Sequence, residues 1–302
     1  MDSTANKRLV IFGCGYVGSA VAQAALAAGA HVEALTRNPD RAAALRALGI
    51  APVAVADLAS SAWHGEIRPG PDFVVNCVSS GGANEAGYRH SYVGGLRSIL
   101  DWAAGGDRPV GTIVYTSSTS VYPQGGGVTL DESAVADGAT PNGRIIRESE
   151  AILEQAPSAA CARHFILRLA GIYGPGRHHL LDQLRAGAPI LSGGGDYHLN
   201  LVHRDDIVGA ILACLAAAPS VSSRIYHVAD DAPARRGEVV AWLSARLGRA
   251  APAFDGSTGV RRGGLPMPDR VISAARIRRE LAWRPHYPDF RAGFGEILQN
   301  NT

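Results

Sequence analysis

The sequence predicts an α/β fold in which a doubly wound parallel sheet is followed by a smaller C-terminal α/β region. Three observations lead to this prediction. Short apolar runs alternate with helical patterns from the N-terminus to about residue 170. These runs lack the polar alternation of a half-exposed strand, as expected for parallel strands that helices cover on both faces. A glycine-rich turn directly follows the first run, where the chain would leave a strand and enter a helix.

The elements of the first part follow one another in regular order. Six apolar runs are predicted to be strands: Arg8–Phe12, His31–Thr36, Ala51–Ala56, Phe73–Cys77, Thr112–Thr116 and His164–Leu169. The patterns between them predict helices over Tyr16–Ala28, Asp40–Leu48, Ala86–Ala104 and Arg144–Gln155. Because crossovers between parallel strands are right-handed, this alternation places helices on both faces of one sheet.

After Leu169 the alternation becomes irregular. Extended segments are expected at Leu199–Val202 and Arg224–Ala229, and helices at Asp206–Ala218, Gly237–Leu247, Ala274–Leu281 and Phe290–Gln299. The segments between them are rich in Gly and Pro and predict loops. We therefore predict two regions, a domain around the sheet and a smaller region. The first is formed by residues 1–170 and 199–232, the second by residues 171–198 and 233–302.

Composition and charge exclude several classes of protein. The chain has 302 residues and a formal net charge of +2, which implies no broad basic surface for nucleic acid. Its most apolar stretch, Ile207–Ala218, is shorter than the roughly 18 residues that a membrane span needs. The four cysteines have neither metal-ligand nor redox-motif spacing, and no signal peptide is visible. We expect a cytoplasmic protein without a metal site and without a nucleic-acid or membrane partner.

The strongest local signal is the sequence G-C-G-Y-V-G at residues 13–18, between the first strand and the first helix. This is the G-x-G-x-x-G pattern in the context that dinucleotide binding requires. Its glycines permit a tight turn, a close approach of the backbone to a pyrophosphate, and close packing of the helix on the sheet. The N-terminus of the helix favours the negative charge of the pyrophosphate. A Rossmann-type domain that binds a dinucleotide is therefore predicted, with a ligand-free turn as the alternative. The contacts expected in this turn are Gly13, Gly15, Tyr16, Val17 and Gly18.

The end of the second strand indicates which dinucleotide binds. NAD sites usually carry an acidic residue there for the ribose 2′-OH, but this strand ends in Thr36 and Arg37. A guanidinium suits a 2′-phosphate, so NADP is the predicted cofactor and NAD the alternative. Asp57, followed by Leu58, either lies near the adenine amino group or caps the next segment. The ends of the fourth and fifth strands complete the expected contacts: Cys77, Val78, Ser79, Thr116 and Ser117.

Several longer motifs carry a resemblance to a known family. They are Y-T-S-S-T-S-V-Y at 115–122, R-L-A-G-I-Y-G-P-G-R at 168–177, N-L-V-H-R-D-D-I at 200–207 and Y-H-V-A at 226–229. With the glycine turn, these motifs resemble the extended short-chain dehydrogenase/reductase superfamily, which contains nucleoside-diphosphate-sugar epimerases and dehydratases. The resemblance covers nearly the whole chain and is closest to an atypical epimerase-like subgroup. It implies an NAD(P)-dependent enzyme with a small-molecule substrate, and a homodimer formed through helices 86–104 and 144–155.

One feature of the family is missing. Family members carry a Y-x-x-x-K pair after the fifth strand, in which the Tyr is the general acid/base and the Lys lowers its pKa. Aligning the pair Gly143 and Arg144 places Asn142 at the Tyr position and Ile146 at the Lys position. An amide exchanges no proton near pH 7, and an isoleucine shifts no pKa. Because positioned acid/base catalysis contributes roughly 10² to 10⁴ in rate, the ordinary epimerase or dehydratase mechanism is excluded at this position.

Four residues are candidates for the remaining catalytic role. The resemblance aligns Ser118 with the family hydroxyl that binds the substrate oxygen. The alternative is that Ser118 caps a helix or turn after the strand. Tyr122 and Tyr173 lie in segments expected to face the cofactor crevice, with core packing as the alternative. His203 could replace the lost acid, because an imidazole titrates near pH 7, or it is a satisfied core histidine.

The substrate side offers basic and imidazole groups. Arg177 and His198 are the candidate substrate ligands, and Arg261 and Arg262 could add charge for an anion. Solvated loop charge is the alternative for the arginines. The sequence thus predicts an NADP-dependent oxidoreductase or epimerase-like enzyme of modified mechanism, acting on a sugar nucleotide or an activated carbonyl or imine. The alternatives are a non-catalytic NADP(H)-binding sensor or scaffold, and an epimerase-like enzyme that retains NAD tightly.

Overall fold

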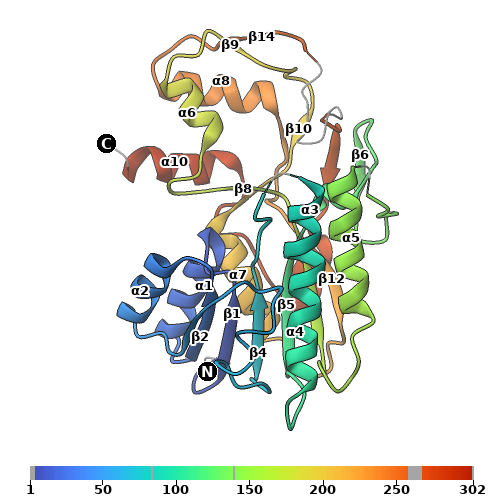
Figure 1. Cartoon of the computed structure of the whole chain (residues 1–302). Coiled ribbons are helices and arrows are strands. Elements are labelled where there is room, and N and C mark those ends of the chain that lie inside the picture. The colour runs from blue at the N-terminus through green and yellow to red at the C-terminus, as the bar shows by residue number, and fades with distance from the viewer. Residues whose placement is uncertain (1–3, 83, 139, 258–266, 301–302) are drawn as a thin grey trace.

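A seven-stranded parallel sheet forms the centre of the computed structural model, which describes residues 4–82, 84–138, 140–257 and 267–300. Its strand order is β12-β7-β5-β4-β1-β2-β3 (Figure 1). The order reverses between β1 and β4, and ligands of such sheets bind beyond the carboxyl ends of the strands at this point. The strands are β1 (Arg8–Phe12), β2 (His31–Thr36), β3 (Val53–Val55), β4 (Phe73–Asn76), β5 (Thr112–Ser118), β7 (His164–Leu169) and β12 (Arg224–Val228). The predicted fold class is confirmed.

Helices cover both faces of this sheet, and each face has its own core. Leu9 and Ile11 of β1 pack in one core with residues of α1 and α7, whereas Val10 and Phe12 pack in the other with residues of α4. This alternation follows from the two-residue period of a strand, whose two faces are both buried here. The helices are α1 (Tyr16–Ala27), α2 (Pro39–Ala47), α3 (Glu85–Tyr88), α4 (Gly95–Ala104), α5 (Pro141–Glu154) and α7 (Arg204–Leu215).

The helix expected over Ala86–Ala104 is interrupted by a π-helical segment, Arg89–Gly94, between α3 and α4. Segments of this kind are rare and are frequently found at functional sites. Two smaller differences also stand out. The helix α7 ends at Leu215, before the predicted end at Ala218, and the extended segment near Leu199 is divided into two short strands.

The smaller region lies beyond the carboxyl ends of the sheet and has a third core of its own (Figure 1). Its helices are α6 (His179–Arg185), α8 (Arg236–Arg246) and α10 (Phe290–Asn300). Two short strand pairs accompany them: β9 (Ile190–Leu191) with β14 (Ala253–Phe254), and β10 (His198–Leu199) with β13 (Ala234–Arg235).

Further short elements join the two regions. The strand β8 (Gly171–Tyr173) pairs with β11 (Leu201–His203), and β6 (Val128–Leu130) pairs with β15 (Arg270–Ile272), just before α9 (Ala275–Leu281). Both pairings join segments that are far apart in the chain, and they hold the smaller region above the sheet. Within the described ranges, no helix combines the length and the apolar character that a membrane crossing requires.

Candidate functional site

The glycine turn between β1 and α1 is shaped for a bound pyrophosphate. Gly13 has a φ of +88°, and a Cβ there would lie 2.6 Å from the backbone nitrogen of Val78. A Cβ on Gly18 would lie 2.3 Å from the carbonyl oxygen of Gly13, so both positions require glycine. At Gly15 a Cβ would meet no described atom within 4 Å, which leaves the turn open. No side chain caps the N-terminus of α1, so its first N–H groups can bind an anion.

A first cavity of about 320 Å³ opens beside this turn, at the carboxyl ends of β1, β2 and β4. It brings together nine residues that the sequence predicts as cofactor contacts: Gly13, Gly15, Thr36, Arg37, Asp57, Leu58, Cys77, Val78 and Ser79. The open turn and the cavity together fit the adenosine and pyrophosphate parts of a dinucleotide. Asn38, Arg41 and Ser91 also line it.

The predicted residues from the fifth strand lie elsewhere. Ser117 donates a hydrogen bond to the buried carboxylate of Glu150, and Thr116 donates one to the Asn76 carbonyl. Neither residue lines the first cavity, and neither do Tyr16, Val17 or Gly18. Tyr16 donates its hydroxyl to the carbonyl of Pro175 in the smaller region.

Arg37 lines the first cavity and lies close to the segment after β4. A Cβ on Gly81 would lie only 2.7 Å from its Nη1 atom, so the guanidinium reaches across from β2 to the segment after β4. Asp57 caps the turn after β3, accepting the Ala59 N–H at 2.8 Å, and it contacts His90 Nε2 at 2.9 Å. Partial burial opposes ionisation, but the His90 and Ala59 hydrogen bonds hold the pKa of Asp57 below its usual range. Both roles considered for Asp57, capping and lining the adenosine site, are compatible with this geometry.

A second cavity of about 330 Å³ lies at the carboxyl end of β5, beside the N-terminus of α5. Asn142 and Ile146, which occupy the Tyr and Lys positions of the resembled family, both line it. Ser118 lines it too, and its Oγ accepts the Ser120 N–H at 3.1 Å. In this capping role the Ser118 oxygen acts only as an acceptor, so its hydroxyl proton can still be donated to a ligand in the cavity. Tyr88, Tyr92, Ser120, Thr140 and Met267 complete the wall.

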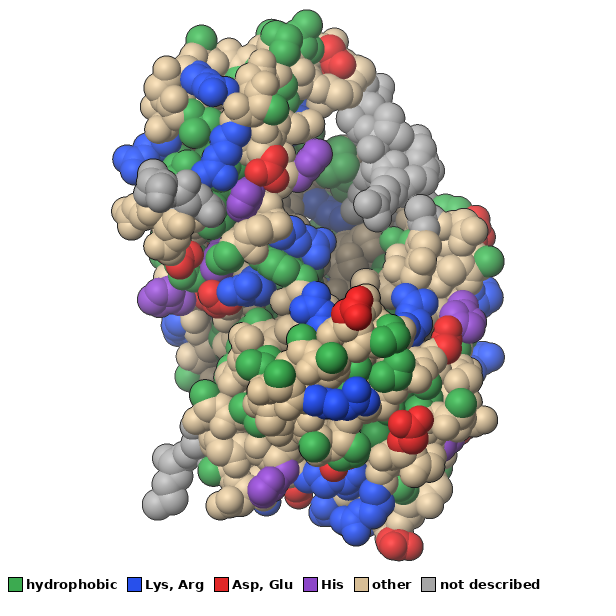
Figure 2. All heavy atoms as spheres, turned by 60° about the vertical axis from the view of Figure 1, so that its left-hand side comes forward, with side chains coloured by type: hydrophobic (Ala, Val, Ile, Leu, Met, Phe, Trp, Pro, Cys, Tyr) green, Lys and Arg blue, Asp and Glu red, His purple; other side chains and the backbone are tan. Residues whose placement is uncertain are grey.

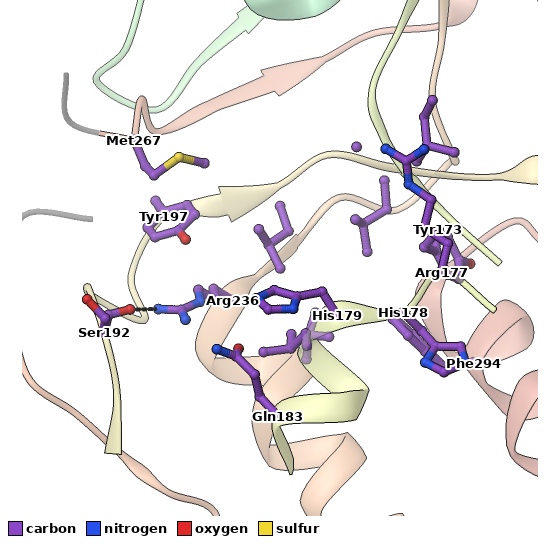
Figure 3. Close-up of a pocket in the computed structure, with 16 residues that line it drawn as sticks. Tyr173, Arg177, His178, His179, Gln183, Ser192, Tyr197, Arg236, Met267 and Phe294 are labelled. Atoms are coloured by element: carbon purple, nitrogen blue, oxygen red, sulfur yellow. Dashed lines mark hydrogen bonds between the residues drawn. The ribbon is translucent and has the colours of Figure 1, made fainter. Parts of the chain in front are cut away.

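A third cavity of about 560 Å³ lies between β8, α6, α8 and α10 (Figure 3). Figure 2 shows a hollow between the sheet and the smaller region, with Lys or Arg side chains along its border. Met267 lines both this cavity and the second one, so the two are neighbours. Arg236 is fixed by donating to the Ser192 and Gly194 carbonyls, at 2.8 and 3.0 Å. The labelled lining residues are Tyr173, Arg177, His178, His179, Gln183, Ser192, Tyr197, Arg236, Met267 and Phe294.

Of the predicted substrate ligands, Arg177 lies in the third cavity, with its guanidinium 5.5 Å from the Tyr16 ring centre. His198 does not line it, because its Nδ1 faces Asp269 Oδ1 at 2.6 Å. Arg261 and Arg262 lie outside the described residues.

Two of the catalytic candidates are buried away from the cavities. Tyr122 has no exposed surface, and its hydroxyl accepts from Arg168 Nη1 and contacts His227 Nε2, both at 2.6 Å. His203 also has no exposed surface, and its Nδ1 accepts the Asp205 N–H at 3.3 Å. Burial lowers the pKa of His203, so its imidazole is neutral near pH 7. The geometry supports core packing for Tyr122. His203 is a core histidine, but it is not fully satisfied, because its buried Nε2 has no hydrogen-bond partner in the described part of the chain.

Tyr173 lies in the third cavity but is a poor acid. It is 3% exposed, and its hydroxyl has no hydrogen-bond partner in the described part of the chain. Burial, reinforced by nearby carboxylates that include Asp230, raises the pKa of Tyr173 far above its usual range. A phenol that holds its proton this tightly neither donates nor accepts readily near pH 7.

The carboxylates beside Tyr173 make stability depend on pH. Burial, with the negative charges of Asp289, Asp231 and Asp206, raises the pKa of Asp230 to about 8. The pKa of an Asp in the unfolded chain is about 4, so the folded state binds the Asp230 proton more tightly than the unfolded state does. The stability linked to Asp230 is therefore complete at low pH and is lost as the pH rises to about 8.

In the wild type, Tm should fall between about pH 5 and about pH 8 as Asp230 loses its proton. We expect the Asp230→Asn substitution to make this fall smaller, because an amide does not titrate in this range. Its Tm at about pH 8 should exceed that of the wild type. The control is Asp196→Asn at an exposed position, which should keep the wild-type slope. Thermal unfolding at a series of pH values measures this, and equal slopes in all three proteins would contradict the assignment.

The sequence analysis assigned no site role to the two phenols of the second cavity, Tyr88 and Tyr92. Their rings pack with centroids 5.4 Å apart. Their four-residue spacing on a predicted helix placed them on one face. That spacing was the available signal, but it is equally typical of core packing.

Comparison with known proteins gives consistent relatives. Residues 9–229 match the model of the NAD dependent epimerase/dehydratase family. Protein YeeZ of Escherichia coli K12 is 32% identical over 198 residues, 66% of each chain. A 3-diazoavenalumate denitrifying reductase from a Streptomyces species is 29% identical over 196 residues, 61% of this chain and 63% of that protein. The chain thus spans slightly less than two thirds of the length of these curated relatives.

A similar solved structure covers the whole fold. An epimerase/dehydratase-like protein from Methylobacillus flagellatus matches with a TM-score of 0.76 and 28% sequence identity. The match covers 98% of this chain and 99% of that protein, so it includes the smaller region as well as the sheet.

Proposed function

Because this chain belongs to the NAD-dependent epimerase/dehydratase family of the extended short-chain dehydrogenase/reductase superfamily, we propose that it is an NADPH-dependent reductase of a small, activated electrophile such as a carbonyl or an imine. The second cavity carries this proposal. It keeps the Ser118 hydroxyl for a substrate oxygen but presents Asn142 and Ile146 where an acid/base pair would be needed.

The reaction class follows from what these side chains can do. Epimerisation or dehydration of a sugar requires a base that removes a proton, and Asn142 cannot serve as one. Reduction of an activated acceptor needs a bound hydride donor, which a nicotinamide cofactor supplies, and hydrogen bonds to the atom that gains charge. The Streptomyces relative is named as a reductase, which supports this class of reaction.

The proposed preference for NADP rests on the residues at the end of β2. Arg37, Asn38 and Arg41 line the first cavity, and no acidic residue follows β2 where a ribose 2′-OH would be bound. Asn38 accepts the Arg41 N–H at 2.9 Å, which fixes the start of α2 beside this site. The two guanidinium groups provide the positive charge that a 2′-phosphate requires.

We expect the Arg37→Ala substitution to weaken NADPH binding about ten- to a hundredfold. This corresponds to the free energy that one hydrogen bond to a charged group contributes. The affinity for NADH should stay close to that of the wild type, because NADH lacks the 2′-phosphate. Fluorescence titration with both coenzymes measures this. The control is Arg97→Ala, which removes an exposed arginine from α4. An equal loss for both coenzymes would contradict the role of Arg37.

The reductase function is tested by following NADPH oxidation against a panel of ketones, quinones, imines, diazonium compounds and sugar nucleotides. We expect turnover with at least one activated electrophile and none with the sugar nucleotides. Silence across the panel, with NADPH shown to be bound, would overturn the proposal.

The loss of the acid/base pair also favours a second candidate, a protein that binds NADP(H) without catalysis and acts as a sensor or scaffold. The two candidates differ in hydride transfer. Stereospecific exchange of a nicotinamide hydrogen with any acceptor would exclude the non-catalytic role.

A further inference from the structure

We propose that Tyr88 is a catalytic residue of the second cavity, where its phenol and the Ser118 hydroxyl donate together to a substrate oxygen that gains negative charge. This inference rests on the proposed reductase function and assigns the proton donor that α5 lacks.

The composition of the cavity wall limits the choice of donor. Thr140 is the N-cap of α5, and its hydroxyl accepts the Gly143 N–H at 2.9 Å. The Asn142 amide is not an acid, and Ile146 and Met267 carry no proton to donate. The phenols of Tyr88 and Tyr92 are therefore the acidic groups among the lining residues.

The two phenols differ in their surroundings. Burial raises the pKa of Tyr92 to about 12, and the Ser80 backbone opposes this rise. Tyr88 is half-buried, and its hydroxyl forms no hydrogen bond with any residue that the structure describes. The Tyr92 ring packs against that of Tyr88 with planes 37° apart, which restricts the orientation of the free phenol.

The backbone that carries Tyr88 is tied to the opposite wall of the cavity. Asn84 caps α3 by accepting the Gly87 N–H at 2.8 Å, and the π-helical segment begins directly after Tyr88. The next residue, Arg89, donates to both carboxylate oxygens of Glu148 on α5, at 2.8 and 2.7 Å. The wall that carries Tyr88 is thus held against the helix that carries Asn142. This places a phenol in the cavity from α3 rather than from α5.

The proton balance of the step is simple. A bound reduced nicotinamide would supply hydride to the substrate carbon, and the electron pair of the carbon–oxygen double bond would move to the oxygen. That oxygen takes the phenol proton of Tyr88, while the Ser118 hydroxyl remains a hydrogen-bond donor. Because Tyr88 is half-buried, the tyrosinate can regain a proton from water.

The test uses 4-nitrophenolate as a stable oxyanion that reports hydrogen bonding through its absorbance. We expect the wild-type protein to bind 4-nitrophenolate, with or without NADP⁺. Binding should lower the pKa of the nitrophenol ligand, because the protein donates hydrogen bonds to its ionised form. The Tyr88→Phe variant should bind it about ten- to a hundredfold more weakly and lose that shift, because one donor to a charged oxygen is gone. Tyr287→Phe is the control, since it removes a half-buried phenol that lines none of the three cavities. It should keep the affinity close to that of the wild type.

Circular dichroism first establishes that each variant is folded. Unchanged binding by Tyr88→Phe, or no binding by the wild-type protein, would overturn the role of Tyr88. Titration with NADPH alone tests the proposed function separately, because it does not involve the phenol. Failure of the coenzyme to bind would therefore be distinguished from failure of the oxyanion site.

Discussion

Replacing Glu150 by leucine is expected to lower the free energy of unfolding by about 3–5 kcal/mol, the cost of leaving one member of a buried ion pair alone. Glu150 has no exposed surface and Arg168 is 2% exposed. Two hydrogen bonds join them, at 3.0 Å to Oε1 and 2.7 Å to Oε2. Without the carboxylate, the guanidinium stays in the core beside Tyr122 with much less compensation, and Ser117 loses its acceptor. Urea unfolding measures the change.

The matched control for this prediction is Glu148→Leu on the same helix. The Glu148 side chain is 38% exposed and pairs with the exposed Arg89, so its loss should cost only about 0–1 kcal/mol. The double variant Glu150→Leu/Arg168→Met should recover part of the lost stability, because no unpaired charge remains. A Glu150→Leu variant within about 1 kcal/mol of the wild type would contradict this account of the core.

The second large effect is expected at Gly15. The Gly15→Asp variant should fold, because a Cβ there meets no described atom and Asp is a favourable N-cap for α1. Its carboxylate would occupy the place of the pyrophosphate, and such contact between like charges costs several kcal/mol. We expect NADPH affinity to fall by a hundredfold or more, which is about 3 kcal/mol, while Tm stays at or above the wild-type value.

The Gly15→Asn variant separates the effect of charge from that of size. Asn is nearly the same size and caps helices equally well, so it should reduce NADPH affinity less than Asp does. Calorimetric titration with NADPH, together with thermal unfolding, measures both properties. If Gly15→Asp bound NADPH as tightly as the wild type, the pyrophosphate would lie elsewhere.

Local patterns were sufficient to predict most of the sheet. The strands His31–Thr36 and His164–Leu169 have the predicted bounds, because buried parallel strands are continuous apolar runs between turn residues. The pairing of Val128–Leu130 with Arg270–Ile272 could not be predicted in this way. Each of these strands is too short to show a period, and the pairing depends on tertiary contacts between distant segments.

The candidate site shows the same division. The glycine turn and Arg37 were found from the sequence, because their chemistry is local to one strand and the turn or strand end beside it. The burial of Tyr122 involves Arg168 and His227, which come from two strands distant in the chain, so its own segment left both the catalytic role and core packing open. Tyr88 was overlooked for a different reason. Its helical pattern predicts a surface or core position equally well and does not reveal the π-helical segment that follows it.

The most direct test of the account is a titration of the purified protein with NADPH and, separately, with NADH. The account predicts that NADPH binds to one site per chain and more tightly than NADH, because the open turn takes the pyrophosphate and Arg37 takes the 2′-phosphate. A protein that is folded but binds neither coenzyme would contradict it.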